Sequence, residues 1–202
     1  MQIKITTEKR GEIERIQRDF KKHLSADVIL RGTSQAINST MKRSISKINK
    51  EVKKEYNITP KYLKRIAVVK PKASSGSLYA GVHLQHAPVP IIGFKPKEKQ
   101  GSGVTVSVKR GRAKRLQSAF IATMQSGHVG VFARGRYGKD FMWGNEKTAS
   151  GKIRITEIKA PSPFAMGLSD TVAPQIQDFM GKEVVRATRG ILQSRVDRMT
   201  RG

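Results

Sequence analysis

Apolar residues recur at helical spacing near the start of the chain. Between Glu12 and Leu24, the side chains of Ile13, Ile16 and Phe20 fall on the same face as Leu24. This spacing predicts a first amphipathic helix. Polar and basic residues fill the remaining positions, as expected for a helix with one buried face.

A longer stretch with the same period runs from Val28 to Tyr56. Lysines and arginines occupy its other faces, so we expect one long amphipathic helix. Thr59-Pro60 then offers a capping residue followed by proline at a first helical position, which predicts a short helix through Lys64. The apolar stripe of the long helix consists of Leu30, Ile37, Met41, Ile45, Ile48, Val52 and Tyr56.

The middle of the chain changes to strand patterns. The ranges 66–70 and 78–84 are predicted strands separated by a Ser-Ser-Gly turn. The apolar range 89–94 is broken by Pro90, which suits the edge of a sheet. Valines alternate with polar residues in the range 104–108, a period-two strand.

A hairpin and a final helix complete the predicted elements. We expect the range 119–122 to pair with 129–132 across a turn at Gly127, with Phe120, Ile121, Val131 and Phe132 in the core. Ile153, Ile155 and Ile158 belong to a last strand that Pro161 and Pro163 end. The final helix is expected to begin at Asp170, and its apolar stripe is Val172, Ile176, Phe179, Val184, Ala187, Leu192 and Val196.

This order of elements predicts an α+β fold. A long N-terminal helix and a C-terminal helix are expected to pack on a small, mainly antiparallel sheet. We interpret residues 1–202 as a single domain, with flexible basic loops near 95–103, 109–117 and 134–152. The last of these loops contains Trp143, to which no role is assigned.

Composition adds a strong charge imbalance. Forty Lys and Arg stand against fifteen Asp and Glu, a formal net charge of +25. This charge favours contact with polyanions or with an acidic protein surface over a basic surface that is exposed only to solvent. It has no cysteine, no apolar run long enough to span a membrane and no secretory signal at its start, so we expect a protein made in the cytoplasm.

The sequence contains only weak matches to motifs for catalysis or for binding of a metal or phosphate. The range 135–140 resembles a phosphate-binding loop, but Ala133 and Asp140 stand where the motif needs Gly and Ser or Thr. His83 and His86 lack further ligands for zinc, and His128 is interpreted as a turn residue. We therefore expect no catalytic, cofactor-binding or metal-binding residues, and a cryptic nuclease or transferase is disfavoured.

Basic residues are concentrated in two segments. The range 42–72 holds eleven Lys or Arg against Glu51 and Glu55, and the range 95–115 holds eight against Glu98. Each segment fits a solvated face, a site near DNA or a contact with an acidic protein. No aromatic residues interleave these runs, so base stacking is not indicated.

Several strings in this order resemble the prophage minor tail protein Z family, typified by the tail completion protein of lambda-like phages. The long helix leads to TPKYLKRIAVVK at Thr59, and a basic loop precedes SAFIATMQSGHVGVFARGR at Ser118. IKAPSPFAMG at Ile158 then leads into the last helix. The resemblance spans roughly Ala36 to Met199, and the segment from Lys139 is less typical of the family.

The resemblance implies a structural protein of the virion. Members act at the head-proximal end of the tail and make it competent to join the DNA-filled head. The expected partners are the tail terminator, the head–tail connector and other copies in a ring, with a hexamer favoured, and contact with viral DNA is non-specific. Seven basic residues are hypothesised to face a lumen or a partner ring: Lys109, Arg110, Arg112, Lys114, Arg115, Arg134 and Arg136.

The alternative function is that of a stand-alone basic nucleic-acid-binding protein. It predicts tight, salt-dependent binding by the isolated monomer, because lysines and arginines release counterions when they neutralise phosphates. The tail interpretation predicts weak binding that depends on assembly.

Overall fold

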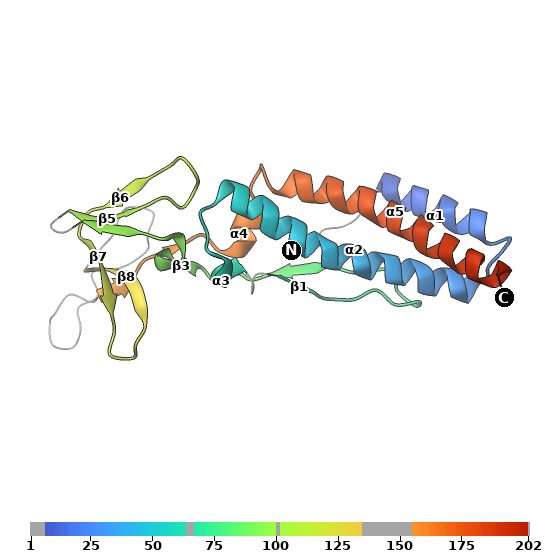
Figure 1. The fold of residues 1–202 in the computed structure, drawn as a ribbon, viewed down its shortest axis with the longest axis horizontal. Coiled ribbons are helices and arrows are strands. Elements are labelled where there is room, and N and C mark those ends of the chain that lie inside the picture. The colour runs from blue at the N-terminus through green and yellow to red at the C-terminus, as the bar shows by residue number, and fades with distance from the viewer. Residues whose placement is uncertain (1–6, 64–66, 100–101, 135–154, 202) are drawn as a thin grey trace. The chain divides into compact units, whose positions relative to one another are not determined.

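The computed structural model describes residues 7–63, 67–99, 102–134 and 155–201 (Figure 1). The chain divides into two compact units. The first, here the helical unit, consists of Met1–Glu51, Ala67–Gln85 and Gly167–Gly202. The second, here the sheet unit, consists of Val52–Ile66 and His86–Met166. The assignment of one domain to the whole chain stays a prediction.

Three long helices make up most of the helical unit. They are α1 (Thr7–Phe20), α2 (Ala26–Glu55) and α5 (Ala173–Thr200), and the last four residues of α2 belong to the sheet unit. The predicted first and second helices are thereby confirmed, with boundaries shifted by a few residues. In Figure 1, α1 lies alongside α5, in agreement with the contacts between them.

The core of the helical unit lies where these helices meet. Ile16 of α1, Ile29 of α2 and Leu192 of α5 are buried in one cluster, which Leu24 of the α1–α2 turn completes. The predicted stripe of α2 is buried along most of its length, although Leu30 and Ile45 are half-exposed. Glycine at position 32 allows close packing, because a Cβ there would lie 2.6 Å from Leu192 Cδ2.

A two-stranded sheet belongs to the same unit. Strands β1 (Ala67–Val69) and β2 (Val82–Leu84) are antiparallel, with Val68 opposite His83. The segment between the strands is attached to α2 by Asn38. Its amide Nδ2 donates to the Ala73 carbonyl oxygen and its Oδ1 accepts from the Ala73 backbone N–H, each at 2.8 Å.

Within its described residues, the sheet unit contains the remaining strands in three small antiparallel sheets. Their orders are β10-β3, β4-β5-β6 and β7-β8-β9. The short helix predicted after Thr59 is confirmed as α3 (Pro60–Leu63). The strands are β3 (Val89–Pro90), β4 (Lys97–Lys99), β5 (Gly103–Val106), β6 (Lys114–Leu116), β7 (Ala119–Thr123), β8 (Val129–Arg134), β9 (Ile155–Glu157) and β10 (Lys159–Ala160).

The predicted hairpin is confirmed. Strands β7 and β8 pair with Phe120 opposite Phe132 and Ile121 opposite Val131. The turn is closed by the Met124 N–H, which donates to the His128 carbonyl oxygen at 2.8 Å. Gly127 in this turn has a φ of +77°, a conformation that glycine adopts readily. Val131 and Phe132 are buried, whereas Phe120 and Ile121 are half-buried.

Several local predictions differ from the structure. Strands β4 and β6 lie within the ranges 95–103 and 109–117 that were expected to be loops, because both pair with the valine-rich β5. The apolar range after Val89 forms only a two-residue strand, followed by the 3-10 helix η1 (Ile91–Phe94). Prediction of an α+β fold is confirmed.

The entry into the last helix also differs. An unpredicted short helix, α4 (Pro163–Gly167), follows the last strand, with the Ser162 Oγ accepting from the Ala165 N–H at 3.2 Å. Helix α5 begins at Ala173, and Val172 at its N-cap makes no side-chain capping bond. Asp170 is therefore not the cap, because a turn that bonds the Val172 N–H to the Ser169 carbonyl oxygen precedes the helix.

Candidate functional site

The C-terminal end of α2 meets the turn that follows β5. Tyr56 forms an isolated β-bridge with Lys109, and the Asn57 N–H donates to the Val108 carbonyl oxygen at 3.0 Å. The Asn57 side chain adds a bond to the Ser107 carbonyl oxygen at 2.9 Å. These bonds fix the first candidate residues, Lys109 and Arg110, within the sheet unit.

Lys109 is held by an ion pair. Its Nζ lies 2.7 Å from Glu55 Oε1 and 5.4 Å from the centre of the Tyr56 ring. The hydrogen bond to the Glu55 carboxylate, followed by the charge interaction with Tyr56, raises the pKa of Lys109 above its ordinary value. Its positive charge is thus partly balanced by a carboxylate of the same chain.

Arg110 caps the end of α2. Its backbone N–H donates to the Glu55 carbonyl oxygen at 2.8 Å, and its Nε donates to the Lys53 carbonyl oxygen at 2.9 Å. The last carbonyls of a helix lack partners within the helix, and the helix dipole favours a cation at that end. Arg110 supplies both the donors and the charge.

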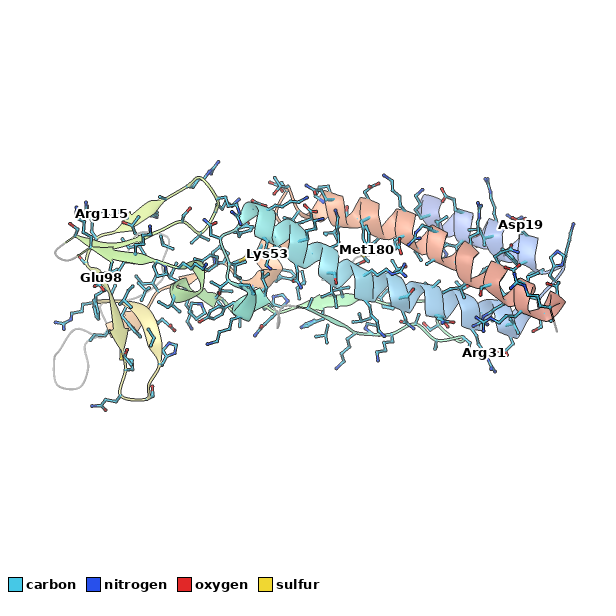
Figure 2. The ribbon with its side chains drawn as sticks, in the orientation of Figure 1. Asp19, Arg31, Lys53, Glu98, Arg115 and Met180 are labelled. Atoms are coloured by element: carbon cyan, nitrogen blue, oxygen red, sulfur yellow. The ribbon has the colours of Figure 1, made fainter. Side chains whose placement is uncertain are left out.

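Two further candidates lie on β6. Lys114 and Arg115 are exposed, and the Arg115 Nε donates to the Ser102 carbonyl oxygen at 2.7 Å. Pairing of the three strands places Arg115, Thr105 and Lys97 in one row. Because side chains alternate along a strand, these three share the exposed face, whereas Val104 and Leu116 share the buried one. Figure 2 labels Arg115 and Glu98 in this sheet.

The other candidates are more scattered. Arg112 is exposed in the turn that contains Gly111, whose φ is +73°. Arg134 is exposed at the end of β8, in a different sheet from Arg115. Arg136 lies outside the described residues, as do Trp143 and the range 135–140. The structure therefore brings Lys109, Arg110, Arg112, Lys114 and Arg115 into one connected region and leaves Arg134 in another sheet.

Sequence reasoning missed a groove beside this region. A cavity of about 450 Å³ opens between α3, η1 and the β4-β5-β6 sheet. Among the described residues that line it, none is acidic. Its polar lining includes Lys95, Lys97, Arg110, Thr105, Thr59 and Ser107. We call this cavity the basic groove. The signal that could have indicated it is the alternation Lys97-Glu98-Lys99, which presents both lysines on one face of a strand.

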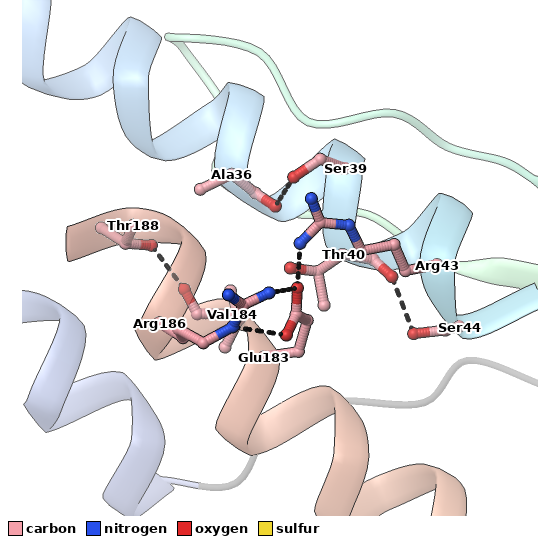
Figure 3. A network of polar contacts seen from close by, with 9 residues as sticks. All are labelled: Ala36, Ser39, Thr40, Arg43, Ser44, Glu183, Val184, Arg186 and Thr188. Atoms are coloured by element: carbon pink, nitrogen blue, oxygen red, sulfur yellow. Dashed lines mark hydrogen bonds and ion pairs between the residues drawn. The ribbon is translucent and has the colours of Figure 1, made fainter. Parts of the chain in front are cut away.

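The helical unit holds a second polar cluster. Glu183 of α5 is buried and forms ion pairs with Arg43 of α2 and with Arg186 at 2.8 Å (Figure 3). The hydrogen bond from Arg186 is the main cause that lowers the pKa of Glu183, and Arg43 adds to it. A cavity of about 320 Å³ beside the cluster is lined by both acidic and basic side chains. This cluster joins α2 to α5.

Buried hydroxyl groups next to this cluster are mostly bonded within their own helices. Ser44 Oγ donates to the Thr40 carbonyl oxygen and Thr188 Oγ1 to the Val184 carbonyl oxygen, each at 2.8 Å (Figure 3). A hydroxyl bonded in this way can be buried at little cost. The Glu183 cluster and its surroundings are thus organised as a structural contact between helices.

The histidines take ordinary polar and aromatic contacts. His86 stacks on Phe164 at 4.0 Å between ring centres, and His128 Nε2 lies 2.7 Å from Glu157 Oε1. His83 lies on β2 with its side chain exposed. The described residues contain no group of three or more His, Asp or Glu side chains close enough to hold a metal ion. Nor do they contain a helix that is long and apolar enough to cross a membrane.

Comparison with known protein families gives a match over most of the chain. The model of the family described as "Prophage minor tail protein Z (GPZ)" matches residues 15–198. This range takes in the last six residues of α1 and almost all of α5, and it includes residues of both compact units. A search of curated proteins and a search of solved structures gave no match.

Proposed function

The chain belongs to the prophage minor tail protein Z family, and from this premise we propose that it completes the head-proximal end of a phage tail and makes the tail competent to join the head. The match over residues 15–198 is the observation that carries the proposal. A structural component of a phage tail is the role that the family supports. Its partners are therefore other tail proteins, and its place is the virion.

We further propose that copies of the chain assemble into a ring, with six subunits favoured, next to the tail terminator and the head–tail connector. The net charge of +25 supports a ring whose exposed surface meets an anionic partner, because unbalanced charge repels other copies unless it is compensated. The side chains proposed for that contact are the exposed Arg112, Lys114, Arg115 and Arg134, together with Arg136, which lies outside the described residues. Lys109 and Arg110 hold the turn that carries them.

Deletion of the gene in its phage tests the tail role directly. The expected result in negative-stain electron microscopy is separate, DNA-filled heads and complete-looking tails, with joined particles restored when the wild-type gene is supplied in trans. Normal virions from the deletion mutant would contradict the proposed role in head–tail joining. The mass of the purified assembly, measured by light scattering, tests the ring separately.

Charge reversal tests the proposed surface. Glutamate at Arg112, Lys114, Arg115 and Arg134 is expected to prevent head–tail joining while leaving the helical unit folded. A matched variant carries the same number of reversals at Lys21, Lys22, Arg31 and Arg198, which are exposed on the helical unit. Equal loss of infectivity in both variants would assign the effect to net charge rather than to this surface.

A further inference from the structure

The basic groove gathers cations without a carboxylate in its described lining. Lys95 follows η1, Lys97 lies on β4, and Arg110 comes from the turn after β5. Elsewhere in the sheet unit a lysine such as Lys109 has a carboxylate beside it. Three cations that converge repel one another, and an anion placed among them removes that repulsion.

The backbone at Lys95 adds an independent observation. Its φ is +51°, in the left-handed region where a residue with a side chain is disfavoured by about 1–2 kcal/mol. Glycine would adopt this conformation without that cost. The Lys95 N–H closes the η1 turn on the Ile92 carbonyl oxygen at 3.4 Å. This backbone conformation, which is common just after a helix, places the Lys95 side chain at the edge of the groove.

The cationic surface continues from the groove across the sheet. Lys97 shares a row with Thr105 and Arg115, and Lys99 lies on the same face, about 6.6 Å farther along the strand. Alternation directs Glu98 to the opposite face. A chain of regularly spaced anions would meet a cation or a hydroxyl at each step along this face.

Both arginines of this surface are held in place by the backbone. Arg110 and Arg115 each use Nε to bond a carbonyl oxygen, of Lys53 and Ser102 respectively. The terminal guanidinium nitrogens are the donors that remain to bind oxygens of a ligand. Because the side chains are already ordered, less conformational entropy is lost when an oxyanion binds.

Among the described residues that line the groove, no large apolar side chain is exposed as an anchor for a ligand. Ile58 and Phe94 line the groove but are only 5% and 2% exposed. A peptide partner gains most of its affinity from apolar anchors, and single-stranded bases gain theirs from stacking on exposed aromatic rings. A surface that offers cations and hydroxyl groups but no such anchors is suited to bind phosphate oxygens. These oxygens carry charge but no sequence information.

We propose that the basic groove and the adjoining face of the β4-β5-β6 sheet bind the phosphate backbone of nucleic acid without reading its bases. Lys95, Lys97, Lys99, Arg110 and Arg115 supply the charge, and Thr105 supplies a hydroxyl group between them. The inference deepens the proposed tail function, on which it rests for the source of the nucleic acid. Its physical basis lies in the sheet unit alone.

Fluorescence anisotropy of a labelled DNA duplex, titrated with the full chain over a series of salt concentrations, tests the proposal. The groove variant carries glutamine at Lys95, Lys97 and Arg115. The control variant carries glutamine at Lys21, Lys22 and Arg198, so both lose the same formal charge. Circular dichroism of each variant verifies folding, which exposed polar substitutions leave intact.

Wild type and control are expected to bind DNA weakly, as the tail interpretation predicts for the isolated chain, and with the same dependence on salt. The groove variant should bind about 10- to 100-fold more weakly at low salt, and the slope of log K against log salt should fall by about 2–3, since each phosphate contact contributes about 0.9. Two duplexes of different sequence should bind equally. A second variant, Lys97→Glu with Lys99→Glu, should weaken binding in the same direction.

Three results would overturn the inference. The first is no binding of DNA by the wild type, and the second is equal weakening in groove and control variants. The third is a polyglutamate of matched charge that binds as tightly as the duplex, which would indicate an acidic protein partner. The binding assay uses isolated protein, so a negative binding result would not contradict the tail function tested by gene deletion. Normal virions after deletion would contradict the tail function but would not change the binding result.

Discussion

Substitution of Gly32 by alanine tests how closely α2 and α5 pack, and the same change at Gly190 provides a matched control. A Cβ at Gly32 would lie 2.6 Å from Leu192 Cδ2, closer than carbon atoms approach in folded proteins. Leu192 is fully buried, so its side chain has little room to move away. At Gly190 of α5, no atom lies within 4 Å of the added carbon.

The two substitutions share one energy term and differ in another. Alanine stabilises a helix by about 0.8–1 kcal/mol relative to glycine, and this gain applies at both positions. At Gly32 the added methyl group overpacks the core, which costs about 1–3 kcal/mol. We therefore expect Gly32→Ala to lower the free energy of unfolding by about 1 kcal/mol and Gly190→Ala to raise it by up to about 1 kcal/mol. Their difference isolates the steric cost.

Urea denaturation followed by far-ultraviolet circular dichroism measures both values. If Gly32→Ala stabilised the protein as much as Gly190→Ala, the close approach of the two helices would be wrong. A Leu192→Ala background identifies the neighbour responsible. That change alone costs about 2–5 kcal/mol, but Gly32→Ala introduced into it should become stabilising. Continued destabilisation there would mean that the clash involves another group.

Two further predictions concern polar contacts of the helical unit. The lowered pKa of Glu183 contributes stability that is present above the unfolded-state value of 4.5 and is lost as pH falls through the folded value. Glu183→Gln should therefore lower the free energy of unfolding by about 1 kcal/mol at neutral pH. It should also reduce the loss of stability below pH 4.5, as measured by urea titration at several pH values. An unchanged loss of stability in acid would contradict this. Asn38→Ala removes both bonds to Ala73 and should cost about 1–3 kcal/mol. Hydrogen exchange of the Ala73 amide should accelerate, whereas Ser39→Ala, which loses only a bond within α2, should leave it unchanged; equal exchange in both variants would refute the role of Asn38.

Local sequence patterns were sufficient to predict an element where buried and exposed positions alternate with the period of that helix or strand. The stripe of α2 predicts its helix because apolar side chains at that spacing face one direction. The β7–β8 hairpin was predictable for a similar reason, since Gly127 marks the turn and Phe132 lies in an apolar run on the second strand. Both elements are determined by neighbours close in the sequence.

Patterns failed where a distant segment decides the structure. Lys97–Lys99 is polar throughout and forms a strand only because β5 offers it a partner. Asp170 has the side chain of a good helix cap, but the turn at Ser169 delays the helix to Ala173. The local sequence indicates neither the partner strand of Lys97–Lys99 nor the delayed start of the last helix.

The candidate site was only partly accessible from the sequence. Clustered basic residues identified the turn and β6, but the roles of Lys109 and Arg110 depend on partners more than fifty residues away. Lys109 pairs with Glu55 across 54 positions, and Arg110 reaches Lys53 across 57. The basic groove needs side chains from α3, η1 and two strands at once, so a linear count of charges could not locate it.

The division of the helical unit along the chain has a consequence for its synthesis on the ribosome. Helix α2 ends at Glu55 and α5 begins at Ala173, so the whole 86–166 segment is translated between them. At about 5–20 residues per second, α1 and α2 wait on the order of 10 s for the helix that carries Leu192. During that interval their apolar stripes have no α5 to cover them. A premature stop codon before α5 would make that exposure permanent and leave a nascent product suited to chaperone capture or proteolysis.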